Sequence, residues 1–283
     1  MIIALSYIFY FLAASASPLQ RRWLAKAKNA ESRSQIDFAF KVTLVTVGFS
    51  LLIPLFSPFE LSGNPLYLFL LALVCGVGGA GFFITSYIAQ KHVEAGISSL
   101  VRNIYTPITI VLASILLNEG LTPLQIAGTI LLLMAMVVVS KKHRIGRFHF
   151  DKYFMLMILG GVLLGFVLTA ERALIKTTGF TTGTMLSWWS QCAALGIAAL
   201  ITKSKQTYSQ KDIMITGTLR FLQSLSWIIL LFVVGNLSVV SAVTTFQVVV
   251  VFIAAALFLH EREDMPRKIV GSIIAVIGLL LMK

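Results

Sequence analysis

Four polar or aromatic side chains at helical spacing carry most of the chemistry that this sequence offers. They stand at positions i, i+3, i+4 and i+7 of one apolar segment, and they are Arg220, Gln223, Ser224 and Trp227. This spacing places all four on one face of a predicted helix. A guanidinium group binds a carboxylate or a phosphate through two parallel hydrogen bonds. The face is therefore a candidate for binding a small anion or zwitterion.

Polar residues recur in two further apolar segments, around Arg102 and around Thr244. If these stripes converge, they line a cavity with two guanidinium groups, hydroxyls, an amide and aromatic walls. The candidate solute-binding residues are Arg220, Gln223, Ser224, Trp227, Arg102, Tyr105, Thr106, Thr244, Thr245, Gln247, Tyr7 and Tyr87. The alternative interpretation is that the serines and threonines hold neighbouring helices together by hydrogen bonds, and that Arg102 and Arg220 extend to the membrane surface.

Enzyme chemistry finds little support in the sequence. There is no Walker A motif, no His-Glu-x-x-His and no pair of aspartates within an apolar segment. The glycine run from Gly76 to Gly81 is not followed by Gly-Lys-Ser/Thr, so it predicts close helix packing rather than a phosphate loop. Cys75 and Cys192 both lie in apolar segments, which gives no metal site. We expect no catalytic residues, no cofactor, no metal and no nucleic-acid partner.

The composition sets these residues in a membrane. Of 283 residues, 58% are hydrophobic and 12% are charged, against about a quarter charged in soluble domains. The apolar residues form long blocks, and a bilayer core of about 30 Å needs about 20 helical residues. The sequence therefore predicts an all-α polytopic membrane protein. Its ten predicted transmembrane helices are 2–20, 37–56, 66–89, 96–117, 124–140, 153–175, 183–202, 213–234, 238–259 and 268–282.

An internal repeat relates the two halves of the chain at an offset of 142 residues. The offset places Asn103 on Thr245 and Glu119 on Glu261, and one inserted residue then places Gly128 on Gly271. Each half holds five predicted spans. Because five is odd, a second copy of the same fold must cross the membrane in the opposite sense. We therefore expect two inverted five-helix repeats, residues 1–142 and 143–283, with a solute site where they meet.

The repeat resembles a known family. Ten spans in two halves, with a glutamate after the fourth span of each half and a glycine about ten residues later, look like the EamA-type branch of the drug/metabolite transporter superfamily. The stretches that carry the resemblance run from Pro107 through Glu119 to Gly128 and from Glu261 to Gly271. The second half departs from it, because Val249 stands where a proline would match Pro107. The resemblance implies a solute carrier, often an exporter of metabolites or amino acids, without specifying the solute.

The basic residues predict the orientation. The odd-numbered loops carry seventeen lysines and arginines, whereas the even-numbered loops and the termini carry three. The positive-inside rule then places the odd-numbered loops in the cytoplasm and both termini outside. Proteins of the family are usually drawn with both termini inside, so the charge count and the resemblance disagree. We follow the charge count.

The function predicted from these features is secondary transport of a small metabolite, anionic or zwitterionic as an amino acid is, by alternating access across the cell membrane. Coupling to protons or sodium stays open, as does the choice between a monomer and a weak homodimer. The alternatives are an exporter of cationic or hydrophobic drugs and a lipid-handling protein without gradient coupling. No carboxylate is expected at a membrane centre. Glu171 and its neighbour Arg172 lie near the end of the sixth predicted span and are expected to reach the interface. Glu119 and Glu261 are expected to bind a basic residue or the N-terminus of the next helix.

Overall fold

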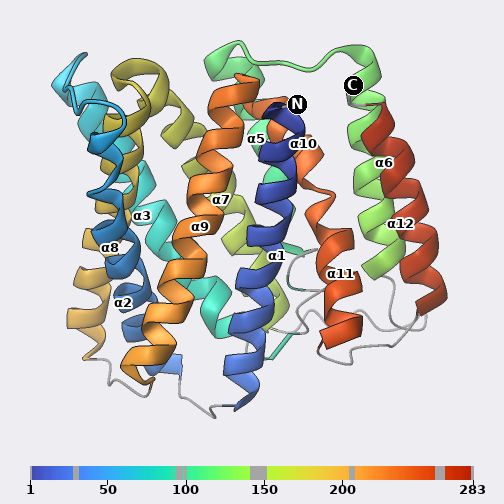
Figure 1. Ribbon diagram of the computed structural model, residues 1–283, viewed down its shortest axis with the longest axis horizontal. Helices are drawn as coiled ribbons and strands as arrows, with labels where there is room; N and C mark the ends of the chain where they lie inside the picture. The colour runs from blue at the N-terminus through green and yellow to red at the C-terminus, as the bar shows by residue number, and fades with distance from the viewer. Residues whose placement is uncertain are drawn as a thin grey trace.

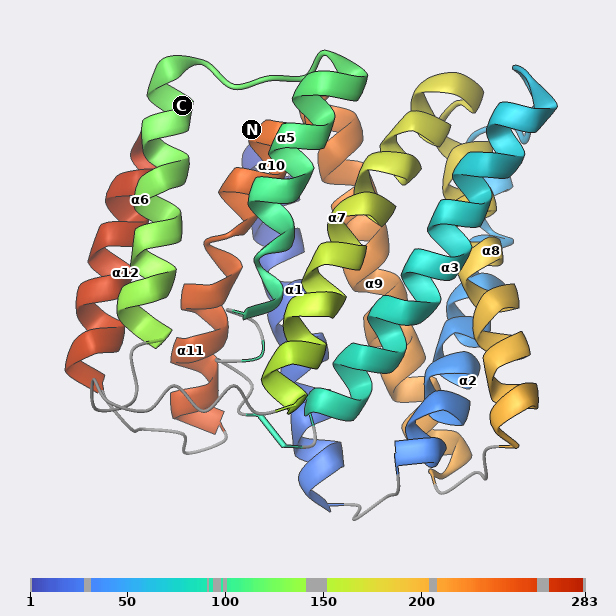
Figure 2. The same ribbon diagram turned by 180° about the vertical axis from the view of Figure 1, so that it is seen from behind.

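A computed structural model describes residues 2–27, 32–90, 92–93, 98, 101–140, 152–203, 208–258 and 265–281. These residues form helices and no strand, as Figures 1 and 2 show from two sides. The helices are α1 (Ile2–Ala27), α2 (Ser32–Ser50), the short 3-10 helix η1 (Ile53–Leu55), α3 (Pro65–Gln90), α5 (Tyr105–Leu117), α6 (Pro123–Ser140), α7 (Lys152–Thr178), α8 (Phe180–Thr202), α9 (Gln210–Val234), α10 (Leu237–Thr244), α11 (Gln247–Phe258) and α12 (Met265–Leu280). Glu261 lies outside the described residues, so the structure describes no counterpart to Glu119.

Six helices in the described part of the chain are long and apolar enough to cross a membrane: α1, α2, α3, α7, α8 and α9. They correspond to the predicted spans one to three and six to eight. The other four predicted spans appear as shorter apolar helices, Tyr105–Leu117, Pro123–Ala135, Leu237–Val251 and Ile269–Gly278. The chain is therefore an all-helical membrane protein. α6 and α12 lie close to the predicted fifth and tenth spans, whereas the fourth and ninth predicted spans are interrupted.

The fourth and ninth predicted spans are each interrupted at the same place in the predicted repeat. Asn103 and Ile104 form a turn ahead of α5, and Thr245 and Phe246 form a turn between α10 and α11. These two turns are separated by the repeat offset of 142 residues. Interrupted helices expose backbone groups and polar side chains at mid-membrane depth, where transporters form their solute sites.

The two interruptions have different local causes. Pro107 has no N–H to donate to the carbonyl of Asn103, which accepts instead from the Thr106 backbone at 3.0 Å in a tighter turn. The second half lacks this proline. There the Thr244 hydroxyl donates to the Val240 carbonyl at 2.7 Å, and such side-chain bonds compete with the helical ladder. The missing proline therefore does not remove the interruption.

The glycine run of α3 packs closely against α7 and α8, as the sequence predicts. A β-carbon added at Gly78 would lie 2.8 Å from the Val167 side chain, and one at Gly76 would lie 3.0 Å from the Ser190 carbonyl. At Gly79 it would overlap the side chain of Gln191. The glycines therefore allow the backbone of α3 to approach both neighbours.

Gly161 on α7 allows a similar approach to the backbone beside Arg102. A β-carbon there would lie 2.6 Å from the Arg102 carbonyl, whereas one at Gly48 on α2 would meet nothing within 4 Å. We expect Gly161→Ala to destabilise the protein by about 1–3 kcal/mol through overpacking. Gly48→Ala is the matched control and should be neutral or stabilising by up to about 1 kcal/mol. Thermal unfolding in detergent measures both; equal melting temperatures for the two variants would contradict the close approach.

The helices form a central group and one outlying pair. α6 and α12 pack on each other at one edge, while α1, α5, α7, α9 and α10 surround the middle of the molecule (Figures 1 and 2). The start of α1 and the end of α12 lie at the same end as the α5–α6 connection (Figure 1). We call this the terminal end. We call the opposite end, where α1 finishes and α9 begins, the basic end, because the helix ends there carry Lys152, Lys203 and Lys211.

Two predicted helix boundaries at the terminal end are confirmed. Thr122 and Gln125 form a capping box at the start of α6, since each side chain accepts from the backbone N–H of the other, at 3.3 and 3.1 Å. Gly235, with a φ of 73°, ends α9, and the Asn236 side chain caps α10 by accepting from the Val239 N–H at 3.1 Å. The chain thus turns sharply at both places.

Glu119 binds basic residues, as the sequence led us to expect, but the helix N-terminus that it contacts is that of α10 rather than that of the next helix, α6. Its carboxylate accepts from Arg172 at 2.9 Å and from Lys176 at 3.3 Å. It also accepts from the backbone N–H of Leu237, the first residue of α10, at 2.7 Å, while the Ser238 hydroxyl donates to its carbonyl. One buried carboxylate therefore joins the end of α5 to α7 and to the N-terminus of α10.

Candidate functional site

A partly enclosed cavity lies between the central helices, with about 80 Å³ in which a water-sized sphere can be centred. Its lining combines charged, amide and aromatic side chains with apolar ones. The residues around it are Tyr10, Phe82, Arg102, Tyr105, Leu164, Val167, Leu168, Glu171, Trp188, Gln191, Arg220, Gln223, Ser224, Trp227 and Gln247. They come from α1, α3, the segment just before the turn that precedes α5, and from α5, α7, α8, α9 and α11. We call this space the central cavity.

The two arginines are the main charged groups of the central cavity. Within the described part of the chain, neither Arg102 nor Arg220 donates a hydrogen bond or forms an ion pair. The Arg220 guanidinium lies 4.5 Å from the centre of the Phe83 ring, a cation–π contact that leaves its N–H groups unbonded. Both arginines are thus available to bind an anionic group.

Glu171 also lines the central cavity, which corrects the expectation that it reaches the membrane surface. It is 4% exposed, and its carboxylate accepts from the Ser187 hydroxyl at 2.8 Å. The Gln191 amide in turn donates to Ser187 at 2.9 Å. The reason is that α7 continues to Thr178 and packs along α8. Arg172, which was also expected at the surface, is instead buried on Glu119.

Further polar atoms of the central cavity differ in whether they have partners. Gln247 is fully engaged, because it accepts from the Tyr10 hydroxyl at 2.8 Å and donates to the Ala14 carbonyl at 2.7 Å. In contrast, the Gln223 oxygen and the Trp227 indole nitrogen are buried without a hydrogen-bond partner among the described residues. Buried polar groups are rarely left in this state. An acceptor and a donor on one face of α9 are therefore free to bind a solute.

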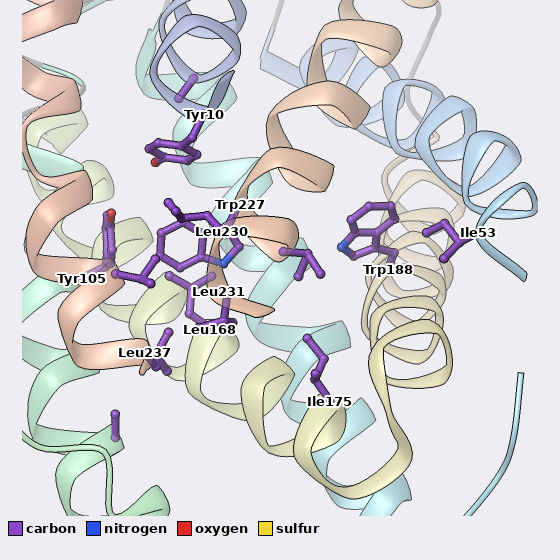
Figure 3. Close-up of a cluster of buried hydrophobic side chains, with 14 residues drawn as sticks. Tyr10, Ile53, Tyr105, Leu168, Ile175, Trp188, Trp227, Leu230, Leu231 and Leu237 are labelled. Carbon is purple, nitrogen blue, oxygen red and sulfur yellow. The ribbon is translucent and has the colours of Figure 1, made fainter. Parts of the chain in front are cut away.

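Aromatic rings form the wall around these atoms. Figure 3 shows Trp227 between Tyr105 and Trp188, with Tyr10 near Trp227, whose ring centre is 5.8 Å away. Rings held in this way form a rigid surface against which the apolar part of a solute can pack.

Seven of the twelve sequence-predicted site residues line the central cavity: Arg102, Tyr105, Arg220, Gln223, Ser224, Trp227 and Gln247. The other five lie elsewhere. Thr106, Thr244 and Thr245 hold the two interrupted helices together; the Thr106 and Thr245 hydroxyls are 3.2 Å apart, and Thr244 bonds to Tyr105 at 3.3 Å. Tyr7 packs on Phe11, and Tyr87 lies under Arg21, nearer the basic end.

Five polar or aromatic lining residues were not among the candidates from the sequence: Tyr10, Phe82, Glu171, Trp188 and Gln191. One signal was present, because a glutamate and a glutamine inside apolar segments are each costly to bury and favour a cavity-facing position. Placing Trp188 required the structure, since tryptophan also occurs at membrane surfaces and in packed cores.

The charges of the central cavity define what it can bind. Two guanidinium groups and one carboxylate leave one positive charge in excess. A solute with a carboxylate near the arginines and an ammonium group near Glu171 would complete the hydrogen bonds of all three. Phe82, Leu164, Val167 and Leu168 add an apolar surface for its remaining part.

Comparisons with known proteins agree with this architecture. Residues 5–141 match the model of the EamA-like transporter family, which belongs to the drug/metabolite transporter superfamily. One solved crystal structure aligns over 96% of this chain and 95% of its own, with a TM-score of 0.65 and 15% sequence identity. At that identity the likeness concerns the fold alone. No curated protein matches the sequence.

The match of residues 5–141 to this family indicates a membrane transporter of the drug/metabolite type, and a transporter family suggests a small-molecule solute. The apolar helices agree with an integral membrane protein. Residues 5–141 contribute Arg102, Tyr105 and Tyr10 to the central cavity. This segment of the chain belongs to the EamA-like transporter family.

Proposed function

We propose that the protein is a secondary transporter of a small zwitterionic or anionic metabolite with a carboxylate group, an amino acid being the clearest example. The solute binds in the central cavity, between two inverted five-helix repeats formed by residues 1–142 and 143–283. Alternating access at the seam of the repeats then exposes the cavity to one side of the cell membrane at a time. The observation that carries this proposal is a cavity with two arginines free of protein hydrogen bonds opposite one buried carboxylate.

The contacts at the two helix interruptions support the inverted repeat. The Asn103 amide lies 3.5 Å from the Thr245 carbonyl, and these two residues are equivalent under the repeat offset. Equivalent residues touch each other where a two-fold axis passes between them. A two-fold axis between the interruptions would therefore run beside the central cavity.

The helix packing supports the same symmetry. Exchanging each helix for its counterpart in the other half turns the α3–α7 interface into the α9–α1 interface, and the α3–α8 interface into the α9–α2 interface. Two pairs of equivalent helices contact each other directly, α2 with α8 and α6 with α12. The α7–α8 interface is the main exception, since its counterpart, α1 with α2, is far smaller.

Flux into proteoliposomes tests the proposal with solutes of different charge. L-phenylalanine is the zwitterionic probe with an apolar side chain, phenylacetate is the monoanion and tetraphenylphosphonium is the apolar cation. We expect saturable uptake of labelled L-phenylalanine that unlabelled L-phenylalanine inhibits. Saturable uptake of the cation together with no uptake of either carboxylate would reject the proposal.

One observation keeps the drug-export alternative under test. Glu171 is a buried carboxylate in the central cavity, and a carboxylate is what an exchanger of cations for protons requires. Two unpaired arginines in the same cavity repel a cation, however, and they outnumber the single acid. We therefore place the carboxylate-bearing solute first, and the cation arm of the flux assay decides between the two.

Glu171 should distinguish a zwitterion from a simple anion. We expect Glu171→Gln to reduce L-phenylalanine uptake at least about tenfold, because the solute ammonium group loses its charged partner. Uptake of phenylacetate, which has no ammonium group, should stay within about threefold of the wild type. Uptake rates for the two labelled solutes measure this. Equal losses for both would place the role of Glu171 outside ammonium recognition.

The orientation is open to a direct measurement. The basic end should face the cytoplasm, so a cysteine added after Lys283 should react with a membrane-impermeant maleimide in intact cells. A cysteine at Lys211, at the start of α9 and at the basic end, is the matched control and should stay unlabelled until the cells are opened. The reverse labelling pattern would overturn this orientation while leaving the central cavity unaffected.

A further inference from the structure

A third arginine, Arg21, is buried between the central cavity and the basic end. It stands on α1 and is 6% exposed, so it does not extend into the water beyond the helix end. Its guanidinium lies 4.9 Å from the centre of the Tyr87 ring, and its Nε donates a long bond of 3.4 Å to the Ser17 carbonyl. In the described part of the chain no carboxylate pairs with it.

Arg21 on α1 and Arg220 on α9 both pack against aromatic rings of α3. Arg21 lies over Tyr87, and Arg220 lies over Phe83, one helical turn away. The two rings are 5.9 Å apart and nearly perpendicular. Two neighbouring rings of α3, Tyr87 and Phe83, thus each contact one guanidinium group. The two contacts follow each other along α3 from the basic end toward the central cavity.

A small cavity beside Arg21 contains an unsatisfied hydroxyl group. About 10 Å³ is open to the centre of a water-sized sphere, and the lining includes Arg21, Gln35, Tyr87 and Tyr208, which is roughly enough for one water molecule. The Tyr87 hydroxyl, on a residue that is 3% exposed, has no hydrogen-bond partner among the described residues. Gln35 and Tyr208 bond to each other at 2.6 Å and brace the wall.

The charge distribution makes an anion the matching ligand. Arg21 repels the guanidinium groups of both Arg102 and Arg220, and Glu171 is the single acid that lines the central cavity. A buried charge without a partner is costly. A solute carboxylate passing between the arginines would offset this cost at each step, and the Tyr87 hydroxyl can donate to it.

We propose that Arg21 and Tyr87 form a second anion-binding subsite, which holds the carboxylate of the solute on its way between the basic end and the central cavity. The proposal rests on the proposed function, because it assumes that the solute carries a carboxylate. It adds a route through α1, α2 and α3 at the basic end, and a residue, Arg21, that contacts the solute outside the central cavity.

The first test separates passage from central binding with labelled L-phenylalanine. We expect Arg21→Gln to slow flux at least about tenfold while the dissociation constant in detergent changes less than about threefold. Arg21→Lys should restore part of the flux. Lys211→Gln removes an exposed charge at the same end and should leave both quantities unchanged. Unchanged flux in folded Arg21→Gln protein, or an equal loss of flux and affinity, would overturn the subsite.

A second variant guards against a folding defect. The Tyr87 hydroxyl is buried without a partner, so Tyr87→Phe should leave the melting temperature equal or raise it. The subsite predicts that the same variant slows flux about threefold or more. A role confined to structure would leave the flux unchanged, and that result would count against the subsite.

The two proposals fail in different ways. Absence of L-phenylalanine flux in the wild type would reject the zwitterion proposal alone. The subsite would then be tested by phenylacetate-dependent thermal stabilisation in the Arg220→Gln background. The subsite predicts a remaining shift in melting temperature that Arg21→Gln removes. No remaining shift, or one that Arg21→Gln leaves intact, would overturn it.

Discussion

Arg220→Gln should reduce carboxylate transport at least about 100-fold, which corresponds to about 3 kcal/mol of binding energy. Arg220 lines the central cavity beside Gln223 and Trp227, and within the described residues its guanidinium donates no hydrogen bond. The glutamine keeps much of the side-chain volume but loses the charge and the two parallel donors that fit a carboxylate. The effect should therefore appear in binding rather than in stability.

The measurement is L-phenylalanine flux in proteoliposomes together with binding in detergent. Arg220→Lys keeps the charge without the planar donor pair, so it should fall between the wild type and Arg220→Gln. Lys211→Gln is the control for loss of a positive charge at an exposed position. Since Arg220→Gln removes a buried cation without breaking an ion pair, its melting temperature should stay close to that of the wild type. Wild-type flux in Arg220→Gln would reject carboxylate recognition by this cavity.

Arg102 provides an internal comparison. It lies in the first half of the chain, just before the interruption ahead of α5, whereas Arg220 lies in the second half. Like Arg220, it donates no hydrogen bond within the described residues. If both guanidinium groups bind one carboxylate, Arg102→Gln and Arg220→Gln should be less than additive when combined, because either change alone already disrupts the shared grip.

The sequence predicted the face of α9 correctly because helical periodicity alone decides which side chains share a face. Arg220, Gln223, Ser224 and Trp227 all line the central cavity, as the spacing of three and four residues requires. The same argument was weaker for Thr244 and Thr245. Their hydroxyls bond to the carbonyls of Val240 and Ser241, a local choice that periodicity does not contain.

Glu171 shows what a single helix cannot reveal. Because Glu171 stands near the predicted end of the sixth span, its side chain was expected to reach the membrane surface. Instead, α7 runs to Thr178, and Ser187 of α8 donates a hydrogen bond to the Glu171 carboxylate. Burial of this carboxylate thus depends on a neighbouring helix that follows a turn at Gly179. Hydropathy likewise does not detect the interruptions of the fourth and ninth spans, because most residues around the two turns are apolar or weakly polar.

The largest expected effect on stability belongs to Glu119. Glu119→Gln should lower the free energy of unfolding by about 3–5 kcal/mol, because it leaves the buried Arg172 guanidinium without a counter-charge. Arg172 is 8% exposed and also donates to the Gly235 carbonyl at 2.5 Å, so it cannot move to water without breaking the turn between α9 and α10. The measurement is thermal or denaturant unfolding in detergent.

The cluster contains its own control. Lys176 contacts the same carboxylate at 3.3 Å, but its side chain is 44% exposed, so solvent screens the pair and Lys176→Gln should cost less than about 1 kcal/mol. Glu119→Leu combined with Arg172→Met removes both buried charges and should recover part of the loss seen in Glu119→Gln. Recovery should be incomplete, since the Leu237 N–H and the Gly235 carbonyl lose their partners. Equal melting temperatures for Glu119→Gln and Lys176→Gln would mean that the charge of Glu119 does not hold α5, α7 and α10 together.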